Sequence, residues 1–217
     1  MKLLAVSVSG IQRIRHHDRW VDTGIFKRPV EGAHRVAATG LETDSQADLE
    51  NHGGVDKAVY AYTIENYRYW EGELGRELTP GQLGENFLVS GMPDEDVHIG
   101  DVFRCNDVVL QVTQPRVPCF KLGICMEDPH FVGRFHHSGR VGFYFRVLEQ
   151  GTVEAGTLIE RVQRDPAGLN IRDAMLALNH GPRQQETIAR ALAIPALSEA
   201  WRVSLAKKQT GNSFTVS

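Results

Sequence analysis

The segment that decides the architecture of this chain reads Gln114-Pro115-Arg116-Val117-Pro118-Cys119-Phe120-Lys121-Leu122. Each of its two prolines fixes its own φ angle and pushes the preceding residue toward extended geometry, so the chain leaves the strand before it along a defined path. Cys119 is thereby presented between two basic residues, Arg116 and Lys121. Positive charge near a thiol favours the thiolate, which attacks electrophiles and binds soft metals. The alternative is an inert packing residue, the commoner fate of a lone cysteine beside apolar neighbours.

Short apolar runs, separated by glycines and Asn or Asp turns, indicate a β-rich domain from Met1 to about Val162. Asn106-Asp107 predicts a tight hairpin whose second strand leads into the Cys119 segment. Strands are expected at Leu3–Val8, Phe26–Val30, His34–Leu41, Ala58–Thr63, Asn86–Ser90, Asp101–Cys105, Val108–Thr113, Gly142–Glu149 and Thr157–Val162. So many short strands at close spacing favour a barrel or a closed sandwich.

Two helices are expected within this β-rich part. The first begins near Ile64, is capped by Thr63, and carries an aromatic stripe that we assign to core packing. The second runs from Cys119 to Met126 and would place the cysteine at a helix N-terminus, where the helix dipole also favours a thiolate.

The composition changes at Asp165-Pro166-Ala167-Gly168, after which the chain is expected to be helical to about Lys208. Asn170 would cap a helix through Leu178, Gly181-Pro182 would open another through Leu192, and Pro195 would stand in the first turn of a third. The sequence therefore predicts a mainly β protein with α: a barrel with inserted helices in residues 1–164, a three-helix unit in 165–210 that docks on the barrel, and a loose tail in 211–217.

Composition and charge exclude several classes of protein. The chain has 217 residues, 41% of them hydrophobic, which is enough for one good core. A formal net charge of −3 argues against a protein that coats nucleic acid. Three cysteines are too few for a disulfide framework and fit a reducing compartment. Residues 3–8 are too short to span a membrane and lack a signal-cleavage pattern, so we expect a cytoplasmic protein with no membrane partner.

Two glycine-rich loops are the other candidate ligand sites. His52-Gly53-Gly54-Val55-Asp56-Lys57 would let a bulky anion approach the backbone, and Lys57 would meet its phosphate; a plain turn with a surface lysine is the alternative. Gly84-Glu85-Asn86-Phe87 precedes an apolar strand, and Asn86 would bind either a ligand or its own loop backbone.

The spacing of the histidines and the absence of several common motifs exclude further kinds of site. His16-His17, His52, His130 and His136-His137 lack zinc-site spacing and are interpreted as surface or loop residues. The sequence contains no P-loop, no Gly-x-Gly-x-x-Gly fingerprint and no Gly-x-Ser-x-Gly elbow. The sequence therefore argues against the common nucleotide-binding folds and against an α/β-hydrolase.

Taken together, the 52–60, 84–87 and 114–119 motifs resemble those of the MOSC domain family, named after the C-terminal domain of molybdenum-cofactor sulfurases. Their order and spacing also match, and the C-terminal helical unit resembles the one carried by the YiiM-like branch of that family. The resemblance covers nearly the whole chain and implies a β-barrel that holds a pterin-based molybdenum cofactor (molybdopterin).

The resemblance implies that Cys119 is the protein ligand to molybdenum, and that the activity is reduction of N-hydroxylated bases such as 6-hydroxylaminopurine. Lys57, Arg116 and Lys121 would balance the charge of the cofactor. His52 and Asn86 would donate to its pterin or phosphate. The proton donor stays open among His52, His130 and the His136-His137 pair.

The sequence carries no flavin, haem or iron–sulfur motif, so electrons are expected from a separate reductase, either a flavoprotein or an iron–sulfur protein. A homodimer is left open. Two rival functions use the same pocket: a sulfur carrier with a persulfide on Cys119, and a non-catalytic module that captures purines or other small anions.

Overall fold

The computed structural model describes residues 1–47, 53–177 and 183–209 of the chain, and a strongly curved sheet forms its centre. Eight strands follow one another in the order β13-β9-β10-β11-β7-β8-β1-β4, and only the pair β7 and β8 is parallel. Their bounds are β1 Lys2–Val8, β4 Arg28–Val30, β7 Val59–Thr63, β8 Phe87–Ser90, β9 Val102–Cys105, β10 Val108–Pro115, β11 Phe143–Glu149 and β13 Ile159–Gln163. The expectation of a mainly β chain with inserted helices is confirmed.

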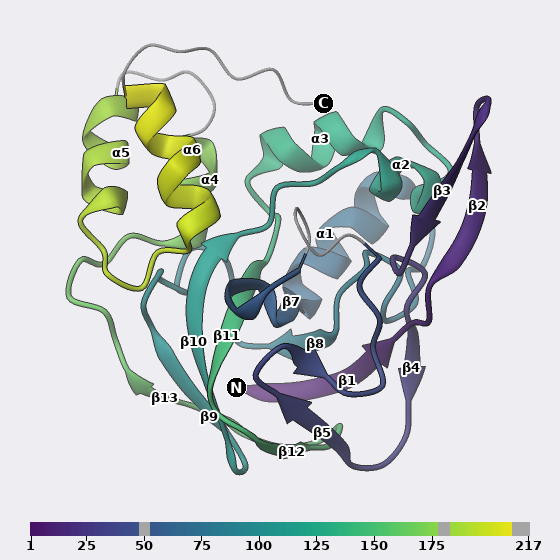
Figure 1. Ribbon diagram of the computed structural model, residues 1–217, viewed down its shortest axis with the longest axis horizontal. Helices are drawn as coiled ribbons and strands as arrows, with labels where there is room; N and C mark the ends of the chain where they lie inside the picture. The colour runs from purple at the N-terminus through teal and green to yellow at the C-terminus, as the bar shows by residue number, and fades with distance from the viewer. Residues whose placement is uncertain (48–52, 178–182, 210–217) are drawn as a thin grey trace.

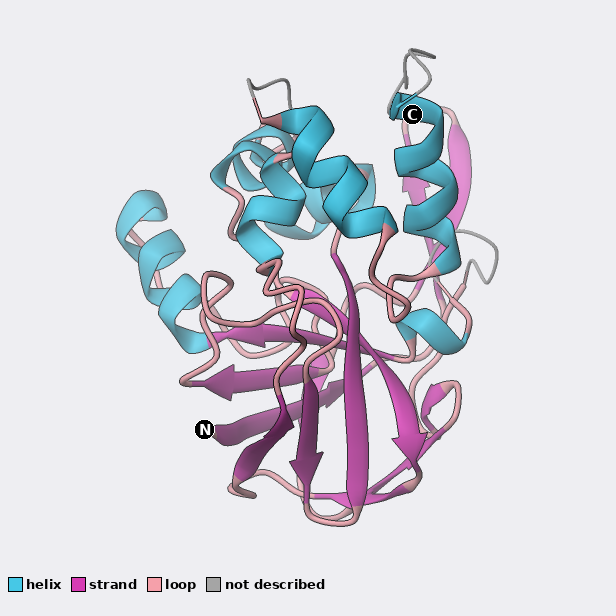
Figure 2. Cartoon of the chain, turned by 90° about the vertical axis from the view of Figure 1, so that its left-hand side faces the viewer, coloured by secondary structure: helices cyan, strands magenta, loops and turns pink. Residues whose placement is uncertain are grey.

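A short seam joins β1, next to one end of this sheet, to the chain that leads into β13 at the other end. The Leu3 N–H donates to the carbonyl of Thr157 at 2.9 Å, and the carbonyl of Leu3 accepts from Gly156 at 2.7 Å. The Ile159 N–H donates to the carbonyl of Met1 at 3.0 Å. The first strand therefore lies against the start of β13, and the sheet curls round on itself as Figure 2 shows.

The remaining elements are small strands and helices around the sheet. The strands are β2 Gln12–His16, β3 Arg19–Thr23, β5 His34–Ala37, β6 Gly40–Leu41 and β12 Gly151–Val153. The helices are η1 Val55–Lys57, α1 Ile64–Leu74, α2 Phe120–Met126, α3 Phe131–Ser138, α4 Ile171–Leu176, α5 Gln184–Leu192 and α6 Glu199–Gln209. Within the described ranges, no helix is both long and apolar enough to cross a membrane.

One strand prediction needs a correction, and several elements were missed. His34–Leu41 is not one strand but the hairpin β5–β6, because a two-residue turn at Ala38-Thr39 reverses the chain and pairs Ala37 with Gly40, whose φ is +123°. A Cβ at Gly40 would lie 2.4 Å from the carbonyl oxygen of Ala58, so only glycine fits there. The β2–β3 hairpin, β12 and α3 had not been expected from the sequence.

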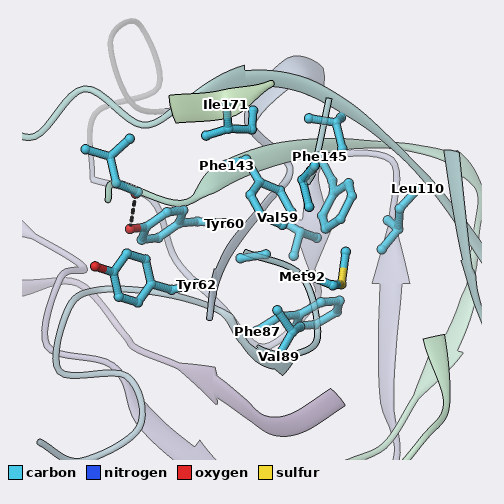
Figure 3. Packing of buried hydrophobic residues seen from close by; sticks show 14 of the residues in the cluster. Val59, Tyr60, Tyr62, Phe87, Val89, Met92, Leu110, Phe143, Phe145 and Ile171 are labelled. Atoms are coloured by element: carbon cyan, nitrogen blue, oxygen red, sulfur yellow. Dashed lines mark hydrogen bonds between the residues drawn. The ribbon is translucent and has the colours of Figure 1, made fainter. Parts of the chain in front are cut away.

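The core fills the inside of the curved sheet. Phe87, Phe143 and Phe145 are almost fully buried, as are two of the three aromatic residues of α1, Tyr67 and Trp70, whereas Tyr69 is 38% exposed. Figure 3 shows these sheet residues packed together, with the tyrosines of β7 at the edge of the cluster and their hydroxyls pointing away from it. Burial of each such side chain contributes on the order of 1.5–3 kcal/mol. The expectation that the aromatic stripe of α1 packs into the core is confirmed for Tyr67 and Trp70 but not for Tyr69.

The C-terminal helices pack on the strands that lead to the cysteine segment. Ser198 donates its hydroxyl to Oε1 of Gln114 at 2.6 Å, and its N–H donates to the carbonyl of Thr113 at 3.2 Å. The carboxylate of Asp56 accepts from the Glu199 N–H, at the start of α6, and from Arg146 of β11. These contacts tie α6 both to β10 and to η1.

Two details of this helical region differ from expectation. The third helix begins at Glu199 and not at Pro195, because the Ser198 hydroxyl accepts the N–H of Trp201 and caps the helix there. The first helix ends at Leu176, and Asn170 caps it as expected. Leu178 and Gly181-Pro182 lie outside the described residues, as does the tail 211–217.

A buried carboxyl group makes stability depend on pH. Asp94 is fully buried, and its side chain binds Asn66 and accepts the Gly142 N–H at 2.9 Å. Burial raises the pKa of Asp94 to about 7, helped by Glu95 and opposed by Arg140. The folded state thus binds more protons than the unfolded state between the two pKa values, so stability conferred by protonated Asp94 is lost as pH rises toward 7.

We expect Asp94→Asn to remove this pH dependence. The difference in free energy of unfolding between the variant and the wild type should move in favour of the variant, by up to about 2.5 kcal/mol, from pH 5 to pH 8. Urea denaturation across that range measures it. Asp96→Asn is the control: burial opposes the shift, but Arg161 and Arg164 hold the pKa of Asp96 below its ordinary value, so its titration lies below this window. A constant Asp94→Asn difference would contradict the prediction.

Candidate functional site

A cavity opens beside the cysteine segment. It is bordered by the chain that follows β3, by residues 44–47, by η1, by the glycine loop before β8, and by the cysteine segment itself. Its lining residues are Thr23, Gly24, Ile25, Lys27, Asp44, Ser45, Gln46, Ala47, Lys57, Tyr60, Gly84, Asn86, Arg116, Val117, Cys119, Lys121 and Tyr144. All three motifs singled out in the sequence therefore contribute to one site.

Cys119 lies on the wall of this cavity and is partly exposed. It stands directly before α2 with extended backbone angles, φ −123° and ψ 172°, and its carbonyl accepts the Leu122 N–H at 2.9 Å. The structure thus places the thiol at the start of a helix, as the sequence indicated. Pro118 and the first turn of α2 hold it there.

The other two cysteines lie in different surroundings. Cys105 is fully buried in the core, and burial raises the pKa of its thiol to about 11. Cys125 donates to the carbonyl of Gln82 at 3.1 Å, and burial again raises the pKa to about 11. Neither residue lines the cavity, so Cys119 is the thiol that a ligand in this site would meet.

Arg116 forms a rigid part of the cavity wall. Its guanidinium lies 4.6 Å from the centre of the Tyr60 ring, and Nη1 donates to the Tyr60 hydroxyl at 3.2 Å and to the carbonyl of Leu83. Burial alone would lower the pKa of Arg116, but the oxygens of Tyr60 and Tyr144 raise it, so the side chain stays cationic. Only 6% of the residue is exposed, which fixes a positive charge at the cavity.

Lys57 and Lys121 approach the cavity from two sides. Lys57 is the last residue of η1, and its backbone carbonyl accepts from Gln46 at 3.4 Å. Lys121 lies in the first turn of α2, and its ammonium donates to the carbonyl of Asp22 at 3.1 Å. Both line the site, whereas His52 lies outside the described residues.

Asn86 also lines the cavity, but its side chain holds the strands together. Its Oδ1 accepts the Tyr60 N–H at 3.1 Å, and its Nδ2 donates to the carbonyl of Ser7 at 3.3 Å and to Asp44 at 2.9 Å. These backbone partners lie on β7 and β1, and not in the loop of Asn86 itself. The amide thereby fixes the geometry of the cavity floor.

The structure also contains a buried ion pair, between Lys27 and Asp44, that the sequence analysis did not predict. The Lys27 ammonium contacts both carboxylate oxygens, and Asp44 also accepts the Ser9 N–H at 2.9 Å. The two side chains are only 7% and 6% exposed. Burial lowers the pKa of Lys27, and Asp44 opposes that shift. The only feature of the sequence that indicates a buried lysine here is its position directly after an apolar pair, Ile25-Phe26.

Glu85 lies behind the cavity wall and is fully buried. Burial raises the pKa of its carboxyl group. The Tyr67 hydroxyl donates to Glu85 Oε1 and lies 3.1 Å from the carbonyl of Thr79. The Gly81 N–H donates to the same Oε1 at 2.5 Å, so the carboxyl group holds the glycine loop before β8 in place.

The cavity carries an excess of positive charge. The described lining residues include four cationic side chains, Lys27, Lys57, Arg116 and Lys121, and one carboxylate, Asp44. Such an excess of positive charge at low-dielectric walls attracts an anionic ligand. The histidines considered as proton donors, His130 and His136-His137, do not line the cavity.

Known proteins resemble this chain over most of its length. The family model of the MOSC domain matches residues 48–160. The uncharacterized protein YflK of Bacillus subtilis is 41% identical over 95% of this chain and 94% of its own length. Protein YiiM of Escherichia coli is 30% identical over 91% of this chain and 89% of its length. A protein named reductase from Gibberella moniliformis is 34% identical over 73% of this chain and 29% of its own.

A solved structure extends the agreement to three dimensions. YiiM from Geobacillus stearothermophilus superposes with a TM-score of 0.81 and 31% identity, over 96% of this chain and 98% of that one. The family resemblance drawn from the three sequence motifs is thereby confirmed.

Proposed function

The chain belongs to the MOSC domain family, and on this premise we propose that it is a molybdenum-cofactor-dependent reductase of N-hydroxylated purines and related N-hydroxylated compounds. Cys119 would be the protein ligand to molybdenum. The observation that carries the proposal is a partly exposed thiol that shares one cavity with four cationic side chains.

The residues present fit such a cofactor. A thiolate is a soft ligand suited to a soft, redox-active metal, and fixed cations suit a phosphate and other anionic groups. Gly84 keeps the wall close-packed: its φ is +82°, and a Cβ there would lie 2.9 Å from Ile25 Cγ1 and 3.6 Å from Arg116 Nη2, so a larger residue would displace the side chains beside the cavity. Arg116 and Lys27 would hold the anionic end, with Lys57 and Lys121 at the sides.

The reaction consumes two electrons and two protons: R–NH–OH gives R–NH2 and water as the N–O bond breaks. When bound, the cofactor would supply a redox-active metal that takes electrons from the donor and delivers the pair that breaks the N–O bond. The chain's own residues hold and orient the reactants. Arg116, which Tyr60 and Leu83 fix in place, keeps its charge at a set position, and the Lys27 and Asp44 pair prevents the floor from rearranging.

The proposal is tested on protein purified from a host that makes the cofactor. We expect stoichiometric molybdenum and pterin, and reduction of 6-hydroxylaminopurine to the amine when a chemical electron donor is supplied. Cyanide-releasable sulfur without stoichiometric metal would instead identify a persulfide carrier on Cys119. Purine binding without repeated turnover would identify a non-catalytic binding module.

A further inference from the structure

The β2–β3 hairpin is an unexpected feature beside the cavity. Among the described residues, β2 and β3 form a two-stranded sheet and pair with no other strand. Figure 1 shows the hairpin projecting from the curved sheet next to α2. An isolated hairpin is at best marginally stable in water, so other contacts must hold this one in place.

The inner face of the hairpin is fastened to the helix that follows Cys119. His16 stacks on Phe120 with ring centres 5.2 Å apart, and the guanidinium of Arg19 lies 5.6 Å from the centre of the same ring. Lys121 donates to the carbonyl of Asp22 at 3.1 Å. Thr23, the last residue of β3, already lines the cavity. The hairpin therefore stands at the edge of the site.

The outer face of the hairpin is open to solvent and has an unusual composition. Strand register pairs Arg15 with Trp20 and Arg13 with Asp22, so these four side chains share that face. Trp20 is 61% exposed, and Ile11, just before β2, is 55% exposed. Tryptophan and arginine are the residue types enriched at the energetic centres of protein interfaces.

The charge of this region indicates the kind of partner. Asp22 pairs with Arg13 at 3.5 Å, which leaves Arg15 beside Trp20 on the outer face. The outer face holds two arginines, Arg13 and Arg15, and one aspartate, Asp22, in a chain whose net charge is −3. The adjoining cavity adds its excess of cations. This face is thus basic on an otherwise acidic protein, and it complements an acidic partner.

We propose that the outer face of the β2–β3 hairpin is the docking surface for an acidic electron-donor protein. This inference rests on the proposed function, since the reaction consumes two electrons per turnover and the chain carries no motif for a second redox centre. A donor seated on Arg15 and Trp20 would bring its own redox group to the edge of the cavity, next to the helix that begins after Cys119.

The test compares two electron sources on the full-length, cofactor-loaded protein. Reduced methyl viologen is a small diffusible donor that needs no docking surface. A flavodoxin kept reduced by NADPH and its reductase is an acidic protein donor. The variant Arg15→Glu with Trp20→Ala leaves the Arg13 and Asp22 pair intact. Its matched control, Arg104→Glu with Leu158→Ala, makes the same change of charge and removes an exposed apolar side chain elsewhere.

We expect the hairpin variant to lower the second-order rate constant with flavodoxin by about tenfold or more, while the viologen-driven rate stays at the wild-type value. The wild-type flavodoxin rate should fall with added salt, and the control variant should match the wild type. Arg15→Glu and Trp20→Ala alone, checked for unchanged thermal unfolding, exclude misfolding of the double variant.

Other outcomes overturn the inference. An equal flavodoxin rate in variant and wild type does so, as does wild-type protein that accepts electrons from viologen but not from flavodoxin; in both cases the proposed function survives. A hairpin variant that changes from dimer to monomer with both rates unaltered would assign the surface to a second copy of the chain. No turnover with either donor removes the proposed function itself.

Discussion

Replacing Cys119 with alanine is expected to lower turnover of 6-hydroxylaminopurine by at least about 1000-fold, because the metal would lose its protein ligand. Pterin content should fall much less, since the cationic residues of the cavity remain to hold the anionic end of the cofactor. Steady-state kinetics with reduced viologen and a molybdenum and pterin analysis measure the two effects separately.

Cys125→Ser is the matched control for that experiment. Serine keeps a donor for the carbonyl of Gln82, so we expect near wild-type turnover and cofactor content. A Cys119→Ala protein that still turns over substrate at the wild-type rate would remove the assignment of the metal ligand. Loss of activity in both variants to the same degree would point to a structural effect of the substitutions.

The second large effect is expected at the buried ion pair in the cavity floor. Asp44→Asn leaves the Lys27 ammonium buried without its counter-charge, and also disturbs the contacts with Asn86 and Ser9. We expect the free energy of unfolding to fall by about 3 kcal/mol or more. Lys27→Met should cost less, because the carboxylate keeps its Ser9 and Asn86 donors.

The double variant Lys27→Met with Asp44→Asn completes a mutant cycle. It should be less destabilised than the sum of the single variants by about 2 kcal/mol, since neither charge is then left alone in the interior. Urea denaturation measures all four proteins. The exposed pair Arg35 and Glu42, at 2.8 Å, serves as control, and its coupling should be below about 1 kcal/mol. Strict additivity at Lys27 and Asp44 would contradict the structure.

Both Lys27 variants should also lose cofactor during purification, if the lysine holds an anionic group. A gel-filtration step followed by pterin analysis reports this loss independently of turnover. Retention equal to that of the wild type would remove Lys27 from the proposed binding set while leaving its role in stability.

Much of the site could be predicted from local sequence because its chemistry is local. The prolines beside Cys119 fix the backbone that presents it, and the glycine loop before β8 needs the positive φ that only glycine adopts readily. The strand that leads into the cysteine segment was found because its hairpin turn, Asn106-Asp107, carries a clear signal.

The features that were missed depend on contacts between distant residues. Lys27 and Asp44 are 17 residues apart and lie on no common periodic pattern, so only the folded chain brings them together. The β2–β3 hairpin is mostly polar, and its inner face becomes a packing surface only when Phe120 lies against it. Helix α3 supplies Phe135, 5.8 Å from the Arg116 guanidinium, a contact that no local pattern marks.

The way α6 is attached has a practical meaning for dissecting this protein. A fragment that ends before the C-terminal helices would strip Asp56 and Gln114 of hydrogen-bond partners, next to Lys57 and Arg116. The cavity of such a fragment would be altered by this loss alone, so lost activity would not show whether those helices contact the substrate. For the same reason, residues of the helices and of the curved sheet that touch each other are expected to vary together among related proteins.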